Sequence, residues 1–226
     1  MGNINASIQQ FILYMVALIF SLSVHESAHA WMSDRFGDDL ARMQGRISLN
    51  PVSHVDPIGT LLFPAIAFFT HAPLIGWAKP TPVNPLKWRN KRVANFWVSA
   101  AGAISNFMIA IIAGIGIRML YVFGITDGLE MNPGSSIIAT GAFELLLTFF
   151  ILNVSLGVFN LLPIPPLDGS KVLQSILPES FEAGFETLER FGFILLFIAV
   201  FTGVLGVVFN VVMPIARDLV FIGSSP

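Results

Sequence analysis

The sequence predicts an all-α polytopic membrane protein with about four transmembrane helices and a re-entrant or membrane-associated segment that includes short extended strands. Composition is the first reason, because 54% of the 226 residues are hydrophobic and only 12% are charged, whereas soluble domains carry about 25% charged residues. The second reason is that residues 1–24 contain no charged side chain. The third is that four apolar stretches reach the roughly 20 residues needed to cross a bilayer.

The four predicted spans are separated by polar or proline-rich connections. They cover Ile8–Met32, Val93–Phe123, Ser136–Leu162 and Phe191–Met213. A fifth apolar stretch, Ile58–Ile75, is shorter and is interrupted by two prolines and His71. Asp56 and Pro57 precede it in the pattern of a helix N-cap followed by a proline in the first turn. We therefore expect a helix to begin there, but one that need not cross the membrane.

The basic residues favour one topology. Eight of the twelve lie between the first two full spans: Arg35, Arg42, Arg46, Lys79, Lys87, Arg89, Lys91 and Arg92. If Ile58–Ile75 dips into the membrane and returns, all eight lie on one face, where Lys171 and Arg190 join them. Basic residues mark the cytoplasmic face. We therefore expect a re-entrant segment, an N-terminus outside, and a multi-pass protein of the cell (plasma) membrane.

The chain shows no internal repeat, and we interpret residues 1–226 as one domain. Its core would cover residues 8–173, followed by a C-terminal transmembrane helix at about 191–213. The sequence has no cysteine, which excludes disulfides and thiolate metal ligands. It also lacks the block of basic residues that is typical of nucleic-acid binding. The expected partners are the lipid bilayer and a membrane-protein substrate.

The first span ends with a group of ionisable residues in the stretch SVHESAHAWM. His25 and His29 are spaced i and i+4, so both imidazoles lie on one helical face and can reach one zinc ion. Glu26 lies beside them and can take a proton from a water activated by the metal. Ionisable groups within a span are costly and mark functional sites. The alternative is a polar trio that faces a partner helix.

A catalytic zinc needs a third protein ligand. The candidates are His54, His71, an aspartate or a glutamate. Asp168 is the strongest, because it follows a proline-broken segment at the end of the third span. Irregular backbone at membrane depth is tolerated where it is buried in protein or lines a watery cavity. The alternative is a surface Asp-Gly turn outside the membrane.

Six motifs give the chain a family resemblance. HESAHA, GRISLNP, HVDPIGT, GWAKPTPVNP, AGAISNF and FNLLPIPPLDG follow one another and cover most of residues 23–173. In this set the chain resembles the site-2 protease family of intramembrane zinc metalloproteases, in a compact form without PDZ or CBS modules. One departure is Ala103, which stands where a proline is common.

The resemblance implies roles for five residues. His25, His29 and Asp168 would bind one Zn²⁺ per chain, and Glu26 would be the catalytic base. Asn160 would help to position the substrate or the developing oxyanion. The substrate would be a transmembrane helix of another protein. Another divalent metal stays open, since nitrogen–oxygen sites follow availability as well as affinity.

A further candidate is an extended segment that could bind the unwound substrate by β-augmentation. It comprises Gly76, Trp77, Ala78, Lys79, Pro80, Thr81, Pro82, Val83 and Asn84. The two prolines remove N–H donors, which suits an unpaired edge. The alternative is a membrane-surface loop anchored by Trp77 and Trp88.

The sequence as a whole predicts a zinc metalloendopeptidase that hydrolyses a peptide bond in or near a transmembrane segment, in regulated intramembrane proteolysis, with its active site toward the cytoplasm. One alternative is a catalytically silent homologue that binds transmembrane clients, against which Glu26 argues. Another is a membrane metal carrier, for which Glu144 within the third span is the one obvious extra ligand. We interpret Asn106, in a stripe of small residues on the second span, as a contact between helices.

Overall fold

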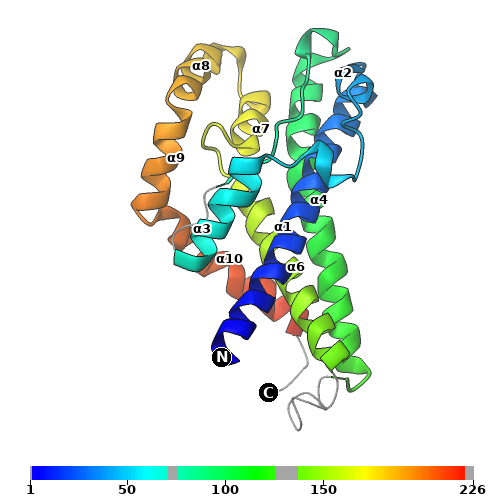
Figure 1. Ribbon diagram of the computed structural model, residues 1–226. Coiled ribbons are helices and arrows are strands. Elements are labelled where there is room, and N and C mark those ends of the chain that lie inside the picture. The colour runs from blue at the N-terminus through cyan, green and yellow to red at the C-terminus, as the bar shows by residue number, and fades with distance from the viewer. Residues whose placement is uncertain (1, 71–75, 126–136, 222–226) are drawn as a thin grey trace.

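The fold is built on three long helices that pack side by side (Figure 1). The computed structural model describes residues 2–70, 76–125 and 137–221. The three helices are α1 (Gly2–Arg35), α4 (Lys91–Val122) and α6 (Ile137–Asn160). Each is long and apolar enough to cross a membrane, as is α10 (Val204–Phe221), so four such helices occur among the described residues. This confirms the predicted helical membrane-protein class.

Short helices connect and extend this bundle. They are α2 (Leu40–Met43), η1 (Pro51–Ser53), η2 (Pro57–Leu62), α3 (Phe63–Thr70), η3 (Pro85–Lys87), α7 (Asp168–Ile176), η4 (Glu179–Phe181), α8 (Glu182–Arg190) and α9 (Gly192–Phe201). The end of α1, the start of α4, and α2, α7 and α8 gather at one end of the molecule (Figure 1).

Small side chains let α4 occupy the centre of the bundle. Ala94, Ala103, Ala110 and Ala113 on this helix are almost completely buried, and α4 packs against both α1 and α6. Small residues allow backbones to approach closely where no water drives apolar surfaces together. The buried face of α4 therefore follows the stripe of small residues in the sequence.

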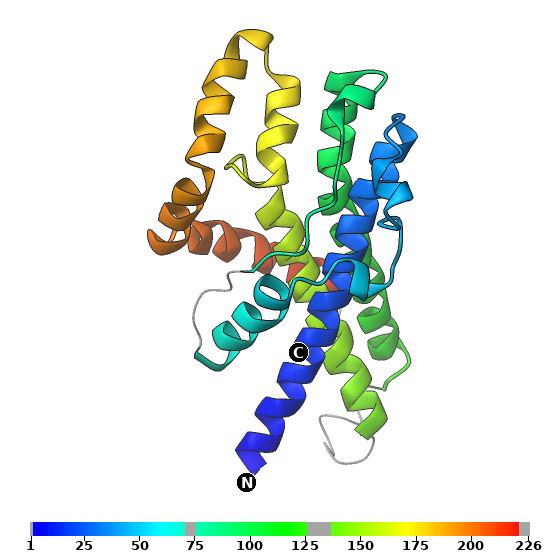
Figure 2. The same ribbon diagram turned by 45° about the horizontal axis from the view of Figure 1, so that its top comes forward.

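The apolar segment between α1 and α4 begins and ends at nearly the same place in the fold. Asp56 caps it by accepting hydrogen bonds from the N–H groups of Ile58 and Gly59, as the sequence predicts. After α3 the chain comes back, and the N–H of Trp77 donates to the carbonyl of Gly59 at 3.2 Å. Figure 2 shows the returning chain passing α1 on its way to α4. The two ends of the segment are thus held together, as in a hairpin.

The predicted short strands are absent from the described residues. Gly76–Asn84, which we call the strap, is an extended loop that pairs with no neighbouring strand. Its N–H groups are used one at a time: Lys79 donates to the carbonyl of His54, and Asn84 donates to the carboxylate of Asp38. A ladder needs a continuous row of partners on one strand, and these acceptors come from separate parts of the chain.

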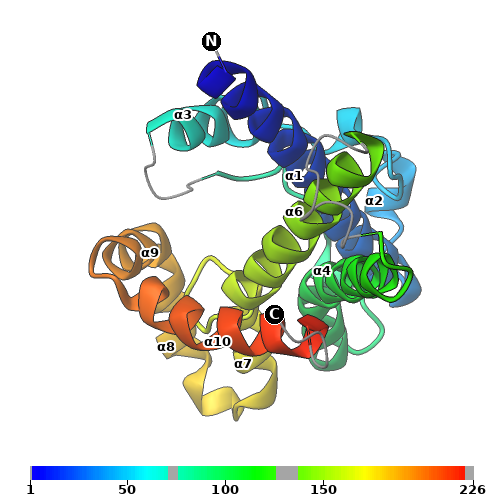
Figure 3. The ribbon, with the colours of Figure 1, turned by 90° about the horizontal axis from the view of Figure 1, so that it is seen from below.

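The prediction of one C-terminal helix over Phe191–Met213 is wrong in its bounds. The chain forms α9, turns at Thr202 and Gly203, and continues as α10. Gly203 has a φ of 78°, a conformation that favours glycine and ends the helix. Seen from below, α10 runs across the bundle and packs against α4 and α6 (Figure 3). The apolar composition continues through the turn, so it gives no sign of the break.

Arg92 fastens α7 to the start of α4. Its guanidinium donates to the carbonyl oxygens of Ser175, Ile176 and Leu177, at 2.7, 2.9 and 2.7 Å. The last carbonyls of a helix have no partner within it, and a cation there also complements the helix dipole. Arg92 therefore fixes the position of α7 and, with it, the position of Asp168.

We predict that Arg92→Met lowers the midpoint of thermal unfolding in detergent by about 2–4 °C, because loss of a helix-terminal cation costs about 1 kcal/mol in a chain of this size. The matched control is Lys91→Met, which removes the neighbouring charge without uncapping α7. Equal midpoints for the two variants would contradict this role of Arg92.

Candidate active site

Three side chains from two helices converge on one point within the bundle. His25 Nε2 and His29 Nε2, both on α1, are 3.0 Å apart, and each is 3.2 Å from Asp168 Oδ2 at the start of α7. The two histidines are buried and Asp168 is nearly so. A group of this kind can hold a metal ion. The structure thus brings together the three residues that the sequence nominates as ligands.

The spacing fits a tetrahedral ion. Ligand atoms about 2.0–2.1 Å from zinc in tetrahedral geometry lie about 3.3–3.4 Å from one another, close to the 3.0–3.2 Å edges of this triangle. Asp168 Oδ2 is also a buried atom without a hydrogen-bond partner in the described part of the chain. A buried carboxylate oxygen in this position needs a cation to compensate for its lost hydration.

Hydrogen bonds on the far side of each imidazole fix its tautomer. His29 Nδ1 lies 2.6 Å from the carbonyl oxygen of Val98, which only accepts, so Nδ1 carries the proton. His25 Nδ1 lies 2.6 Å from Oδ1 of Asn106 and donates in the same way. Each Nε2 therefore keeps its lone pair for a metal, in the arrangement by which neighbouring groups orient metal ligands.

Asn106 does more than the sequence analysis predicts for it. Its Nδ2 donates to Oδ1 of Asn153 on α6, whose Nδ2 donates to the hydroxyl of Ser21 on α1. This series of hydrogen bonds sets the direction of the Asn106 amide and turns Oδ1 toward His25. The one signal in the sequence is a carboxamide within a stripe of small residues, and it does not show which helix the amide faces.

Asp168 is placed by the tight return of the chain after α6. The loop 161–167 turns back so closely that a Cβ on Gly169 would lie 2.2 Å from the carbonyl oxygen of Leu161. Burial opposes ionisation of Asp168, and a cation bound between the carboxylate and the two imidazoles would offset that cost.

Gly102 on α4 forms the wall of the site opposite α1. A Cβ at this position would lie 2.5 Å from His25 Nε2 and 2.5 Å from His29 Nε2. Real side chains do not approach so closely. Glycine is therefore required here so that α4 can reach the ligands without displacing them.

Glu26 is next to the ligands and contacts the strap. Its Oε2 accepts the N–H of Thr81 at 2.8 Å, and its backbone carbonyl accepts the hydroxyl of Thr81 at 2.9 Å. Of the strap residues in the predicted site, Thr81 is thus the one that meets Glu26 directly. Asn160 lies at the end of α6, where its Nδ2 donates to the carbonyl of Leu156 in its own helix. In the described part of the chain, no hydrogen bond joins the Asn160 side chain to the ligand cluster.

The weaker candidates lie elsewhere. His54 donates through Nε2 to the carbonyl of Ser48, and burial lowers the pKa of its imidazole; it does not join the ligand group. His71 lies outside the described residues. Glu144 accepts a hydrogen bond from Gln9 at 3.0 Å.

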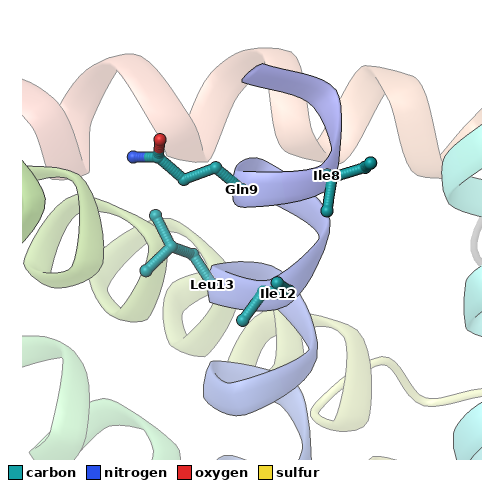
Figure 4. Close-up of a pocket in the computed structure, with 4 residues that line it drawn as sticks. All are labelled: Ile8, Gln9, Ile12 and Leu13. Atoms are coloured by element: carbon teal, nitrogen blue, oxygen red, sulfur yellow. The ribbon is translucent and has the colours of Figure 1, made fainter. Parts of the chain in front are cut away.

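A shallow groove on α1 is not part of the site. It is lined by Ile8, Gln9, Ile12 and Leu13 (Figure 4). The last of these precedes His25 by twelve residues, or about 18 Å along a helix.

Comparison with known proteins identifies the family. The description "Peptidase family M50" matches residues 13–205, most of the chain. The chain belongs to peptidase family M50. The protein is similar to the "Putative zinc metalloprotease YwhC" of Bacillus subtilis (strain 168), with 38% identity over 85% of this chain and 81% of the relative. It is also similar to the "Putative zinc metalloprotease Rip2" of Mycolicibacterium smegmatis, with 27% identity over 85% of this chain and 68% of the relative. No solved structure gives a significant match.

Membership of this peptidase family confirms the resemblance seen in the motifs. All three ligand candidates lie within the matched residues 13–205. The region also contains Glu26, the strap and the whole of α4. The match thus spans every element that builds the cluster.

We predict that Gly102→Ala removes bound metal from an M50 peptidase of this geometry, because the added methyl group occupies the space of the two ligand nitrogens. The measurement is zinc per chain in detergent-purified protein. Gly141→Ala is the matched control, since nothing lies within 4 Å of a Cβ at that position of α6. Wild-type zinc content in Gly102→Ala would rule out the close approach of α4.

Proposed function

We propose that this protein is an intramembrane zinc metalloprotease that hydrolyses a peptide bond in or near a transmembrane segment of another membrane protein. The observation that carries the proposal is the cluster of His25, His29 and Asp168 between helices long and apolar enough to span a membrane. Membership of peptidase family M50 indicates that the reaction is hydrolysis of a peptide bond. Residues 1–226 would form a single domain.

Zinc is the metal that the protein uses. The relatives are named as zinc metalloproteases, and a site of two imidazoles and one carboxylate is typical of catalytic zinc, which keeps one position open. When bound, the ion polarises the scissile carbonyl and makes a water molecule acidic enough to attack at neutral pH.

The side chains of the protein would carry out the proton transfers. Glu26 would accept the proton of the attacking water and then give it to the leaving amine, as a general base and acid. The N–H groups that His25 and His29 direct at Asn106 and Val98 would keep both imidazoles oriented. Asn160 would contact the substrate or the developing negative oxygen.

The substrate must lose helical structure before it can be cut, because a helix holds each peptide group in an i→i−4 hydrogen bond. The strap is the proposed contact for the unwound stretch, since it reaches Glu26 through Thr81. The sequence predicts that the strap would bind this stretch by pairing with it as a β-strand. In the structure the N–H groups of Trp77, Lys79 and Thr81 already have acceptors, so a substrate would contact other groups or displace these bonds.

The active site would lie toward the cytoplasmic side of the cell (plasma) membrane. The end of the molecule that holds α2, α7, α8 and the start of α4 (Figure 1) also contains most of the basic residues. The return of the chain at Gly59 and Trp77 supports a segment that does not cross. His25 lies ten residues, about 15 Å along the helix, from Arg35 at the end of α1.

We predict that purified wild-type protein holds about one zinc per chain, and that His25→Ala and Asp168→Ala lose it or bind it much more weakly. Glu26→Gln should keep zinc but lose cleavage, because the amide cannot accept the proton. Zinc is measured by mass spectrometry. Cleavage is measured as new N-termini within transmembrane segments, in membranes of cells that produce each variant.

The matched control for Asp168→Ala is Asp218→Ala, which removes an exposed carboxylate from α10. A wild-type protein without zinc, or normal zinc binding by Asp168→Ala, would contradict the site. Full cleavage by Glu26→Gln would contradict the role of the base. Zinc binding with no Glu26-dependent fragments would favour a protein that holds transmembrane clients.

For the topology, we predict opposite accessibility of two introduced cysteines, in a chain that has none of its own. In intact cells a membrane-impermeant maleimide should label Ile125→Cys and leave Gln44→Cys unlabelled, and inside-out vesicles should give the reverse. Labelling of both from the same side would contradict the re-entrant arrangement.

A further inference from the structure

We infer that Thr81 is a positioning residue, whose backbone N–H holds the Glu26 carboxylate in the orientation needed for proton transfer. The inference rests on the proposed role of Glu26 as the base. It concerns how that side chain, on a helix that otherwise presents metal ligands, is fixed from outside its own helix.

The contact between Thr81 and Glu26 has two parts. The N–H donates to Oε2 at 2.8 Å, and the hydroxyl donates to the backbone carbonyl of the same glutamate at 2.9 Å. The hydroxyl bond fixes Thr81 relative to the backbone of α1, and the N–H bond then fixes the end of the Glu26 side chain. A free glutamate has three rotatable bonds, so a single donor at its tip selects one orientation among many. A hydrogen bond to an ionised acceptor is also among the stronger ones.

The bond leaves the other carboxylate oxygen for chemistry. Among the described residues, Oε1 of Glu26 accepts no hydrogen bond. Oε2 is therefore held in place by Thr81, whereas Oε1 is free to accept a proton. A proton acceptor held in this way needs no rearrangement when the water attacks.

The strap itself is held firmly two residues before Thr81. The N–H of Lys79 donates to the carbonyl of His54 at 2.8 Å, and its carbonyl accepts from the Arg46 guanidinium at 2.5 Å. Both partners are buried, with 1% exposure for His54 and 5% for Arg46. Lys79 is thus fixed at both its donor and its acceptor by groups that do not move freely.

Prolines on both sides of Thr81 carry this rigidity forward. Pro80 and Pro82 have φ restricted to about −65°, and each restricts the residue before it to extended conformations. Thr81 therefore has few conformations available once Lys79 is fixed. Its N–H points at Glu26 before any substrate binds, which avoids an entropic cost during the reaction.

The first test measures the hydrogen bond without using activity. Hydrogen–deuterium exchange is measured on the strap in detergent-purified protein. The strap has few amide protons, because Pro80 and Pro82 have none, so the exchange of the Thr81 amide is simple to follow. Glu26→Ala removes the acceptor and should speed exchange of the Thr81 amide about tenfold or more. The Lys79 amide, whose acceptor is the carbonyl of His54, is the internal control and should keep its protection. Equal exchange of Thr81 in wild type and Glu26→Ala would overturn the inference.

The second test separates positioning from substrate binding. It uses a quenched-fluorescent single-span peptide that contains a cleavage site found by the fragment comparison described above. Thr81→Pro removes the N–H and should lower kcat about 10- to 100-fold, with KM changed less than threefold and zinc per chain retained. Thr81→Val keeps the N–H and loses the hydroxyl, so its loss in kcat should be smaller, and Thr81→Ser should lose least.

The outcomes distinguish this inference from the proposed function. If Glu26→Gln is inactive while Thr81→Pro keeps the wild-type kcat, the positioning role is wrong and the protease assignment stands. A rise in KM alone in Thr81→Pro would also overturn it, in favour of a substrate-binding role. If Glu26→Gln is fully active, the base assignment itself fails.

Discussion

The meeting of one carboxylate with two imidazoles across the bundle is the contact on which the rest of this structure depends. Asp168 comes from α7 and the histidines from α1, more than 130 residues earlier in the chain. Neither side is stable alone in apolar surroundings, because buried polar groups without partners are costly. The residues around the cluster make this contact possible. Gly102 gives the clearance, Val98 and Asn106 orient the rings, and Arg92 holds α7 in place.

The parts of the site that depend on local spacing could be predicted from the sequence. His25 and His29 must share a face because helix geometry places i and i+4 together. Three of the predicted spans agree with helices to within a few residues, because length and apolar composition decide where a chain can cross a bilayer. Asp168 could be nominated by its proline-broken setting. Only the folded chain shows that its carboxylate reaches both imidazoles.

The parts that depend on how helices pack could not be predicted in this way. Asn106 has the same local sequence context whether it faces His25 or a neighbouring helix, and the hydrogen-bond chain to Asn153 and Ser21 decides between them. The strap reads as a strand in its composition, yet its acceptors come from separate places in the chain. The turn at Gly203 is one residue in an apolar run, and its positive φ is not visible in hydropathy.

The first helix is polar on its inner side and apolar on its outer side. Ser21, His25, His29 and Ser33 are buried at four-residue intervals, whereas Ile12 and Phe20 are 54% and 44% exposed on the surface. During synthesis α1 emerges long before α4, which begins 56 residues after α1 ends. Until then the two histidines lack the oxygen atoms of Val98 and Asn106 that accept their hydrogen bonds. The polar side of the first helix is therefore covered in steps, first by α4 and finally by Asp168 of α7, which comes more than 130 residues after the histidines.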